Sequence, residues 1–211
     1  MPPHETKDTI LDAAEALFAE QGFAATSLRQ LTQQADVNLA AVNYHFGSKE
    51  ELVKAVLLRR VGPINAERRR RLAALESPTT EDVVRAFLEP ALRAIGGADA
   101  AKGGPLRGFA RIIGRVTVEQ PAFLRPFIAE QFSELAAAFV AALRATAPNV
   151  DARAMWLRMH FTIGAMAHTL QSSHLLAQVS DGALVADDPE ELLEQLVAYA
   201  VGGFTAEQSA R

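Results

Sequence analysis

The chain has 211 residues, 49% of them hydrophobic and 22% charged, which is enough apolar content for a globular protein of one or two domains. It has no cysteine, which excludes a disulfide framework and thiolate chemistry, and its formal net charge of −4 differs from the basic balance of many nucleic-acid binders. The N-terminus lacks a signal-peptide pattern, and no uninterrupted apolar stretch approaches the ~18 residues of a membrane span. We therefore expect a soluble, cytoplasmic protein with no membrane partner.

Helical periodicity dominates the sequence, and no segment alternates as a strand does. The first helix is expected over about 6–21, with Gly22 as its terminator. Two short helices follow over 28–35, capped by Thr26 or Ser27, and over 39–46, capped by Asn38. A fourth helix begins at a capping box, Ser48 with Glu51, and continues to Arg68–Arg71, with a kink or break expected at Gly62-Pro63.

Five further helices are expected near 80–96, 105–119, 121–147, 151–177 and 189–206. The predicted fold is thus all-α with about nine helices. We divide it into a three-helix, helix-turn-helix unit over 1–48, a connecting helix over 49–75 and a helical body over 76–211. The body is the predicted site of ligand binding and dimerisation.

Two short helices joined by a tight turn after a supporting helix are the parts of a helix-turn-helix. Their inward positions hold Leu28, Leu31, Ala35, Val37, Val42 and Phe46, which are expected to pack on Phe18 and Phe23. The outward face of the third helix is small and ends in polar aromatic residues, which suits entry into a DNA major groove. Arg29 has the chemistry to pair with guanine, the alanines can contact thymine methyl groups, and Lys49 can bind phosphate.

The predicted DNA-binding residues are Thr26, Ser27, Arg29, Asn38, Leu39, Ala40, Ala41, Asn43, Tyr44, His45 and Lys49. Among them we expect Arg29, Ala41 and Tyr44 to read bases. We expect Thr26, Asn38, His45 and Lys49 to hold phosphates. Over residues 26–49 the fully charged side chains are Arg29, Lys49 and Asp36, so this tip is slightly positive although the chain is acidic.

The stretch TILDAAEALFAEQGFAATSLRQLTQQADVNLAAVNYHFGSKEELVKAVL closely resembles the DNA-binding domain of TetR-family transcriptional regulators. The resemblance covers about a quarter of the chain and includes the Gly22-Phe23 turn and the Phe46-x-x-Lys49-x-x-Leu52 pattern. Many members have Tyr where this chain has Asn43, a departure that bears on the operator sequence. The resemblance implies a homodimer that binds a palindromic double-stranded DNA operator. It also implies release from the operator when a small molecule occupies the body.

Two helices of the body, 151–177 and 189–206, are apolar on two sides, which indicates burial on two sides. One side of each is expected to meet a second copy of the chain in a four-helix dimer interface. The predicted interface residues are His160, Gly164, Ala167, Gln171, His174, Leu192, Leu196, Tyr199 and Gly203.

The body is also rich in phenylalanine, which favours an apolar ligand pocket. The predicted pocket residues are Phe109, Arg111, Arg115, Phe127, Trp156, His160, Phe161 and His168, with an arginine holding an anionic head group. The segments NLAAVNYHFGSKEEL, VGP at 61–63 and RMHFTIGA at 158–165 resemble fatty-acid-responsive members of the family. They imply a long-chain fatty acid or acyl-CoA as effector, and a multidrug-type effector is the rival.

Catalysis is not expected. His160 and His174 share a helix face but lie ~21 Å apart along the axis, too far for one metal, and no catalytic motif is present. We expect no metal and no cofactor. The tract Arg68–Arg71 is interpreted as a solvated face and not as a second phosphate site. The alternative from another class is a helical dimeric protein whose three-helix unit contacts protein and not DNA.

Overall fold

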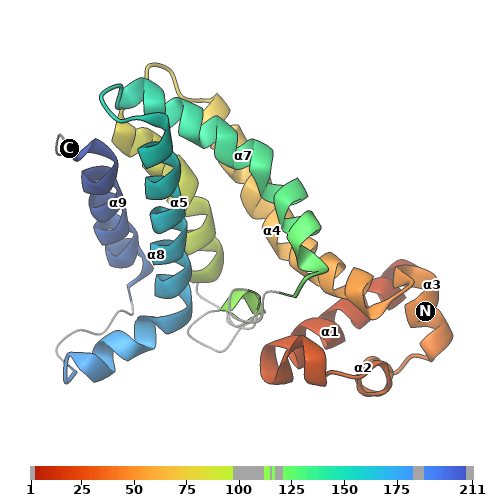
Figure 1. Ribbon diagram of the computed structural model, residues 1–211. Helices are drawn as coiled ribbons and strands as arrows, with labels where there is room; N and C mark the ends of the chain where they lie inside the picture. Colours follow the sequence, from red (N-terminus) through yellow and green to blue (C-terminus); the bar gives the residue numbers. More distant parts are fainter. Residues whose placement is uncertain (1–2, 97–111, 115, 117–120, 183–187, 208–211) are drawn as a thin grey trace. The chain divides into compact units, whose positions relative to one another are not determined.

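The computed structural model describes residues 3–96, 112–114, 116, 121–182 and 188–207 (Figure 1). The expected all-α fold is confirmed. Eight helices have their bounds within the described part, and the expected helix over 105–119 lies mostly outside the described residues. The chain forms two compact units, residues 1–63 with 98–127 and residues 64–97 with 128–211. The boundary between the units therefore falls inside the fourth helix, whereas the division at 48 and 75 stays a prediction.

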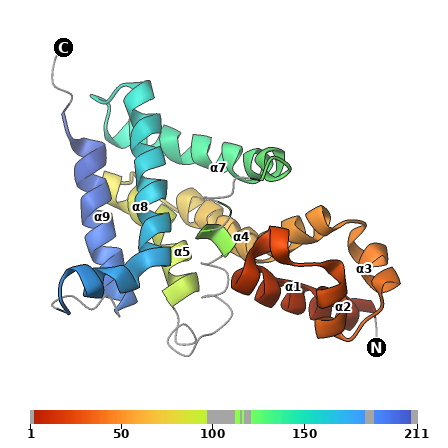
Figure 2. The ribbon, with the colours of Figure 1, turned by 60° about the horizontal axis from the view of Figure 1, so that its bottom comes forward.

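The first unit contains three helices that pack on one another: α1 (Pro3–Ala25), α2 (Leu28–Ala35) and α3 (Leu39–Phe46) (Figure 2). Gly22 has φ 86° and ψ 172°, a conformation open essentially to glycine alone, so the regular part of α1 stops where the sequence predicted. The rings of Phe18 and Phe23 meet edge to face at 5.3 Å between centroids. The core of this unit comprises Ile10, Ala14, Leu17, Phe18, Phe23, Leu31, Ala35, Val42 and Phe46, and these burials confirm most of the expected inward positions.

Helix α4 (Lys49–Ala73) runs through Pro63 without interruption, so of the expected kink or break the break is absent, and the kink stays a prediction. Proline removes one N–H, which leaves the carbonyl of Arg59 without its helical partner, but α4 continues on both sides of Pro63. The first half of α4 is joined to α1 by ion pairs: Arg59 contacts Asp12 and Glu15, and Arg60 donates to Glu15 at 3.0 Å. Burial lowers the pKa of Arg59, but the hydrogen bonds and charges of the buried Glu15 and of Asp12 outweigh this effect and raise it overall.

The second unit contains the end of α4 with α5 (Thr80–Gly96), most of α7 (Leu124–Thr146), α8 (Ala152–Val179) and α9 (Pro189–Thr205). Helices α8 and α9 lie side by side, and α9 also packs on α5 (Figure 2). The core comprises mainly Val84, Phe87, Leu88, Leu135, Phe139, Leu143, Met155, Met159, Leu193, Val197, Ala200 and Phe204. Arg158 of α8 donates to the carbonyls of Phe204 and Ala206, both at 2.8 Å, and so caps the end of α9.

Helix α7 is long and apolar enough to cross a membrane by length and composition. It is the one such helix in the described part of the chain. Glu130 and Glu134 both lie exposed on it, and carboxylates within a span are costly. Composition alone is therefore weak evidence for a membrane span here.

Candidate DNA-binding surface and helical body

Helix α3 presents a small, exposed face on a buried scaffold. Val42 and Phe46 are 1% and 8% exposed and anchor the helix to the core of the unit. Leu39, Ala40, Asn43 and Tyr44 face solvent, and Ala41 is half-buried. Tyr44 is 84% exposed, more than any other large hydrophobic side chain in the described residues. A helix held from one side only, with small residues on the other, has the shape that groove entry requires.

The ends of α2 and α3 are fixed by side-chain caps. Ser27 and Gln30 form a reciprocal capping box at the start of α2. Asn38 Oδ1 accepts a hydrogen bond from the N–H of Ala41 at 2.8 Å, as expected. Between the two helices Asp36 adopts a left-handed conformation with φ 51° and ψ 46°, which closes the tight turn.

Thr26 does not have the predicted role. It is 1% exposed, and its hydroxyl donates to the carbonyl of Gly22 at 2.8 Å, so its side chain stabilises the turn after α1. The cap of α2 is Ser27, which remains exposed. A phosphate contact from the Thr26 side chain is excluded in this conformation because the hydroxyl is buried and already engaged.

Aromatic and basic groups gather at the C-terminal end of α3. The rings of Tyr44 and His45 meet edge to face at 5.1 Å between centroids, and His45 lies 6.2 Å from Phe46. The exposed Tyr44 ring is thereby supported by a half-buried histidine. Lys49 is the first residue of α4. The preceding residue, Ser48, caps this helix, because its Oγ accepts a hydrogen bond from the N–H of Glu51 at 3.1 Å. The predicted side chains Arg29, Tyr44, His45 and Lys49 are all at least partly accessible.

The predicted ligand pocket is not formed by the described residues. Trp156, His160, Phe161 and His168 are all exposed on α8, and Phe127 is half-buried. The inward face of α8 instead carries Met155, Met159 and Thr162. The apolar periodicity of this helix did not separate its inward face from its exposed face. Phe109, Arg111 and Arg115 lie outside the described residues.

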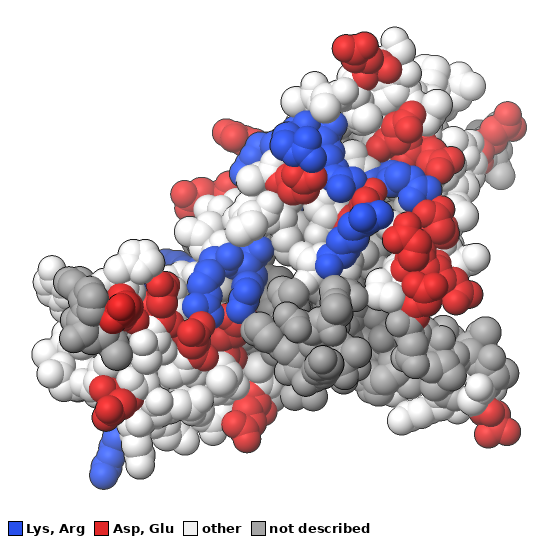
Figure 3. Space-filling view, turned by 180° about the vertical axis from the view of Figure 1, so that it is seen from behind, with Lys and Arg blue, Asp and Glu red and all other residues white. Residues whose placement is uncertain are grey.

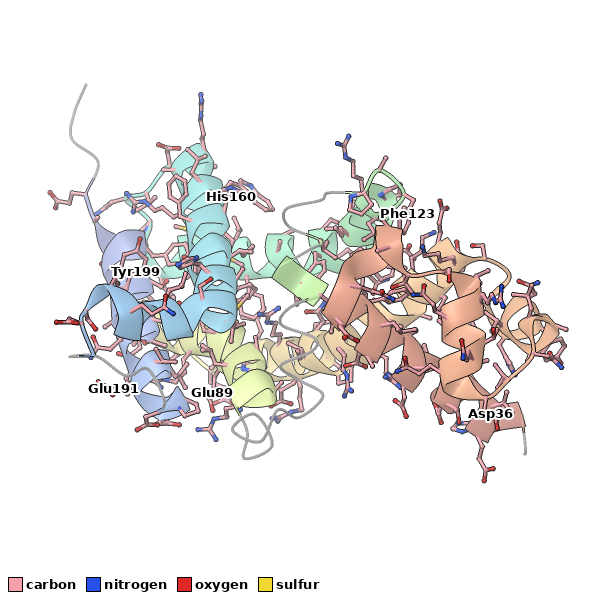
Figure 4. The ribbon with its side chains drawn as sticks, turned by 90° about the horizontal axis from the view of Figure 1, so that it is seen from below. Asp36, Glu89, Phe123, His160, Glu191 and Tyr199 are labelled. Carbon is pink, nitrogen blue, oxygen red and sulfur yellow. The ribbon has the colours of Figure 1, made fainter. Side chains whose placement is uncertain are left out.

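Exposed apolar side chains lie on α8 and on the neighbouring α9. Trp156, Leu157 and Phe161 are between 46% and 59% exposed, and Tyr199 of α9 is 66% exposed. Figure 4 marks His160 on α8 and Tyr199 on α9. Gly164 and Gly203, also exposed, would have no heavy atom within 4 Å of an added Cβ. Large exposed apolar surfaces of this kind mark contact sites.

Of the other predicted interface residues, Ala167 and Leu192 are half-buried. Leu196 is wrongly placed by the sequence, because it is 7% exposed and belongs to the core of its own protomer. The side chains of Gln171 and His174 lie outside those that the structure describes.

The tract Arg68–Arg71 is only partly a solvated face, which corrects the sequence interpretation. Arg70 and Arg71 pair with Glu67, and their guanidinium groups lower the pKa of Glu67 to about 2. Arg71 also pairs with Glu89 of α5 at 2.7 Å. Basic and acidic side chains are accordingly interspersed in the view of Figure 3. Arg68, by contrast, is 3% exposed and lies in the interior of the second unit.

A signal for the burial of Arg68 exists in the sequence. Positions 61, 65, 68, 72 and 75 follow the alternating spacing of four and three residues that defines the inward stripe of a helix. Val61 and Asn65 are buried with Arg68, and Leu72 and Leu75 pack on the core of the second unit. The run of four arginines at 68–71 made it difficult to recognise from the sequence that one of them belongs to this inward stripe.

The three-helix scaffold with its exposed α3 defines a helix-turn-helix DNA-binding protein joined to a helical body. Comparison with known proteins gives the family. Residues 10–56 match the bacterial regulatory proteins of the tetR family, and residues 85–203 match the tetracyclin repressor-like C-terminal domain. The second match covers more than half of the chain. The chain therefore belongs to the TetR family of transcriptional regulators, which are not enzymes.

Similarity to curated relatives covers only part of the chain. An HTH-type transcriptional repressor of Mycobacterium tuberculosis is 51% identical over 53 residues, which are 25% of this chain and 28% of the relative. The regulator TtgR of Pseudomonas putida is 42% identical over 53 residues, 25% of each protein. These matches thus span only about a quarter of the length of the relatives.

Solved structures match over nearly the whole chain but share the fold alone. The TetR-family regulator PfmR from Thermus thermophilus has a TM-score of 0.62 at 21% identity, covering 95% of this chain and 99% of that one. The fatty acid degradation regulator FadR from Bacillus halodurans has a TM-score of 0.67 at 13% identity, with 94% and 95% covered.

Proposed function

We propose that this regulator is a ligand-responsive, dimeric, cytoplasmic repressor that binds a palindromic operator and is released from it by a small apolar effector. The exposed face of α3 on its buried scaffold is the observation that carries the DNA-binding part. In a dimer with two such units, half-sites one helical turn apart require a spacing of about 34–36 Å, or a multiple of it, between the two recognition helices.

The described surface supports a division of labour among the DNA-binding residues. Arg29, Ala41 and Tyr44 read base edges, with Leu39, Ala40 and Asn43 lining the same face. His45 and Lys49 hold phosphates at the far end of α3. At the N-terminal end of α3 the side-chain oxygen Oδ1 of Asn38 accepts the capping hydrogen bond, which leaves the side-chain N–H groups of Asn38 to bind phosphate. The exposed hydroxyl of Ser27 is a further phosphate ligand.

The dimer forms through the exposed side of α8 and α9, to which Trp156, His160 and Phe161 also belong. Isologous contact of two copies would bury these side chains and Tyr199. The open space around Gly164 and Gly203 lets a partner helix approach closely. This surface accounts for more of the exposed apolar residues of α8 than a pocket inside the protomer does.

The effector we propose is a long-chain fatty acid or acyl-CoA bound in the body. The resemblance of three segments to fatty-acid-responsive members supports this, as does the shared fold with a regulator named for fatty acid degradation. Binding acts on α4, which carries Lys49 at one end and body residues at the other. The effector shifts the protein between two states only by binding them unequally. The rival is a multidrug-type effector. In that case an apolar cation, and not a fatty acid, would bind the body and release the protein from the operator.

A gel shift with the DNA upstream of the chain's own coding sequence tests the proposal. We expect wild-type binding that falls steeply between 50 and 200 mM salt, as phosphate contacts require. Tyr44→Ala combined with Lys49→Ala should abolish it. Arg69→Ala is the matched control, because it removes an exposed cation from the body and should leave binding unchanged.

Two results would reject DNA binding by this surface. One is the absence of any palindrome-dependent complex with the wild type, and the other is undiminished binding by the double variant. Binding of a protein partner that persists at high salt would instead support the alternative in which the three-helix unit contacts protein.

A further inference from the structure

Arg68 is a buried cation without a carboxylate partner among the described residues. Its guanidinium is surrounded by neutral groups from three helices. Nε donates to the carbonyl of Phe87 at 2.8 Å, and Nη1 donates to Asn65 Oδ1 at 3.2 Å. Nη2 donates to the thioether of Met166 at 3.4 Å, and Cζ lies 4.1 Å from the centroid of the Phe87 ring.

The nearest acidic residues along the chain are already matched by other arginines. Glu67 pairs with Arg70 and Arg71, and Glu89 pairs with Arg71 and Arg93. Figure 4 marks Glu89 on α5. Arg68 forms no ion pair within the described ranges, although buried charges in proteins are as a rule paired. Arg68 is thus a buried positive charge that pairs with neither of these carboxylates.

Burial lowers the pKa of Arg68 to about 10, so the side chain is still a cation at neutral pH. A guanidinium has five N–H donors in a planar fork, of which the three contacts above use three. The contact with sulfur is the weakest of the three, because a thioether is a poor acceptor. Met166 is flexible and half-buried, so its thioether can be displaced.

We propose that Arg68 binds the anionic head group of an amphipathic effector, which displaces Met166 and makes a bidentate contact with the guanidinium. Carboxylate and phosphate both fit this fork. The remainder of the effector is apolar, because Phe87 and Met166 border the charge and Phe87 packs on Phe139 in the core. This inference deepens the proposed function, since it names the charge of the effector and the residue that recognises it.

Because Arg68 is a residue of α4, an effector bound to it would contact α4 directly. Asn65, one turn before it, donates to the carbonyl of Gln131 on α7 at 3.3 Å. Arg68 and Asn65 therefore join α4 to α5, α7 and α8. An anion that replaces the Met166 contact breaks the link from Arg68 to α8 and leaves those to α5 and α7 in place. Arg68, which would select the effector by its charge, thus belongs to α4, the helix through which the effector would act.

Calorimetric titration of the full-length protein without DNA tests the inference with four ten-carbon probes below their micelle concentrations: decanoate, decyl phosphate, 1-decanol and decylammonium. For the wild type, decanoate or decyl phosphate should bind at least tenfold more tightly than decanol, and decylammonium least. Comparison of the two anions identifies the head group. In Arg68→Met the preference for the anion over decanol should disappear. Arg69→Met, an exposed control in the same tract, should keep it.

The inference is overturned if decanol binds the wild type as tightly as both anions, if neither anion binds, or if the preference survives in Arg68→Met. Where Arg68→Met does not fold, a wild type without an anion preference still overturns the inference. Because no DNA is present in this titration, a wild type without an anion preference, or an Arg68→Met variant that keeps it, rejects the role of Arg68 and leaves the proposed operator binding untouched. Failure of operator binding in the gel shift, with the preference intact, rejects the proposed function instead.

Discussion

The proposed dimer surface on α8 and α9 can be tested by substitutions that are expected to stabilise the protomer and to weaken its association. Gly164 and Gly203 are interior residues of helices, where alanine is favoured over glycine by about 0.5–1 kcal/mol. An added Cβ at either site meets nothing in the protomer. Gly164→Ala and Gly203→Ala should therefore each stabilise an isolated protomer by up to about 1 kcal/mol.

The same methyl group should weaken the dimer. Overpacking a close contact costs about 1–3 kcal/mol, and a two-fold interface meets each substitution twice. Since 1.4 kcal/mol is a tenfold change, the dimer dissociation constant should rise by at least about tenfold in each variant. Sedimentation at a series of dilutions measures this constant, and urea unfolding of the dilute protein measures the protomer.

Ala138→Gly on the exposed side of α7 is the control. It makes the opposite change in helix propensity, from alanine to glycine, on a helix outside the proposed dimer surface. It should lower stability by up to about 1 kcal/mol without altering association. An unchanged dissociation constant in both glycine variants would refute the assignment of this surface to the dimer.

Three further predictions concern stability. Phe46→Ala, which removes the anchor of α3, should cost about 3–5 kcal/mol in urea unfolding and abolish the gel shift. Glu15→Gln breaks the ion pairs of α1 with two partly exposed arginines of α4, and we expect a loss of about 1–3 kcal/mol at pH 7 by the same assay. The pKa of Glu67 is lowered from 4.5 to about 2, so its stabilisation is present above pH 4.5 and is lost as the pH falls toward 2. Glu67→Gln should unfold at lower urea than the wild type at pH 7, and the two midpoints should converge near pH 2; a constant difference would contradict the assignment.

The DNA-binding unit was predictable because its signals are local. Ser27 and Asn38 cap their helices, Gly22 ends the regular part of α1, and the expected bounds of α2 and α3 agree with the structure. Each of these features depends on a few neighbouring residues and needs no knowledge of the remaining fold. Even here the choice between Thr26 and Ser27 as the cap was open, since both hydroxyls suit it and only packing buries Thr26.

The body was less predictable because its interior is chosen by tertiary contacts. Periodicity predicts two apolar sides for α8, and packing against α5 and α9 decides that Met155 and Met159 face inward while Trp156 and Phe161 do not. The break expected at Pro63 is absent because a single lost hydrogen bond does not outweigh the remainder of α4. The interpretation of Arg68 is wrong because a run of four arginines indicates a solvated face, although the spacing places one of them inside.

The most direct test of the central claim is selection of the purified protein's binding sites from a pool of random duplex DNA. The account predicts enrichment of one palindromic sequence whose half-sites lie about one helical turn, or a multiple of it, apart. Enrichment of no sequence, or of sites without two-fold symmetry, would contradict a dimer that reads DNA through two copies of α3.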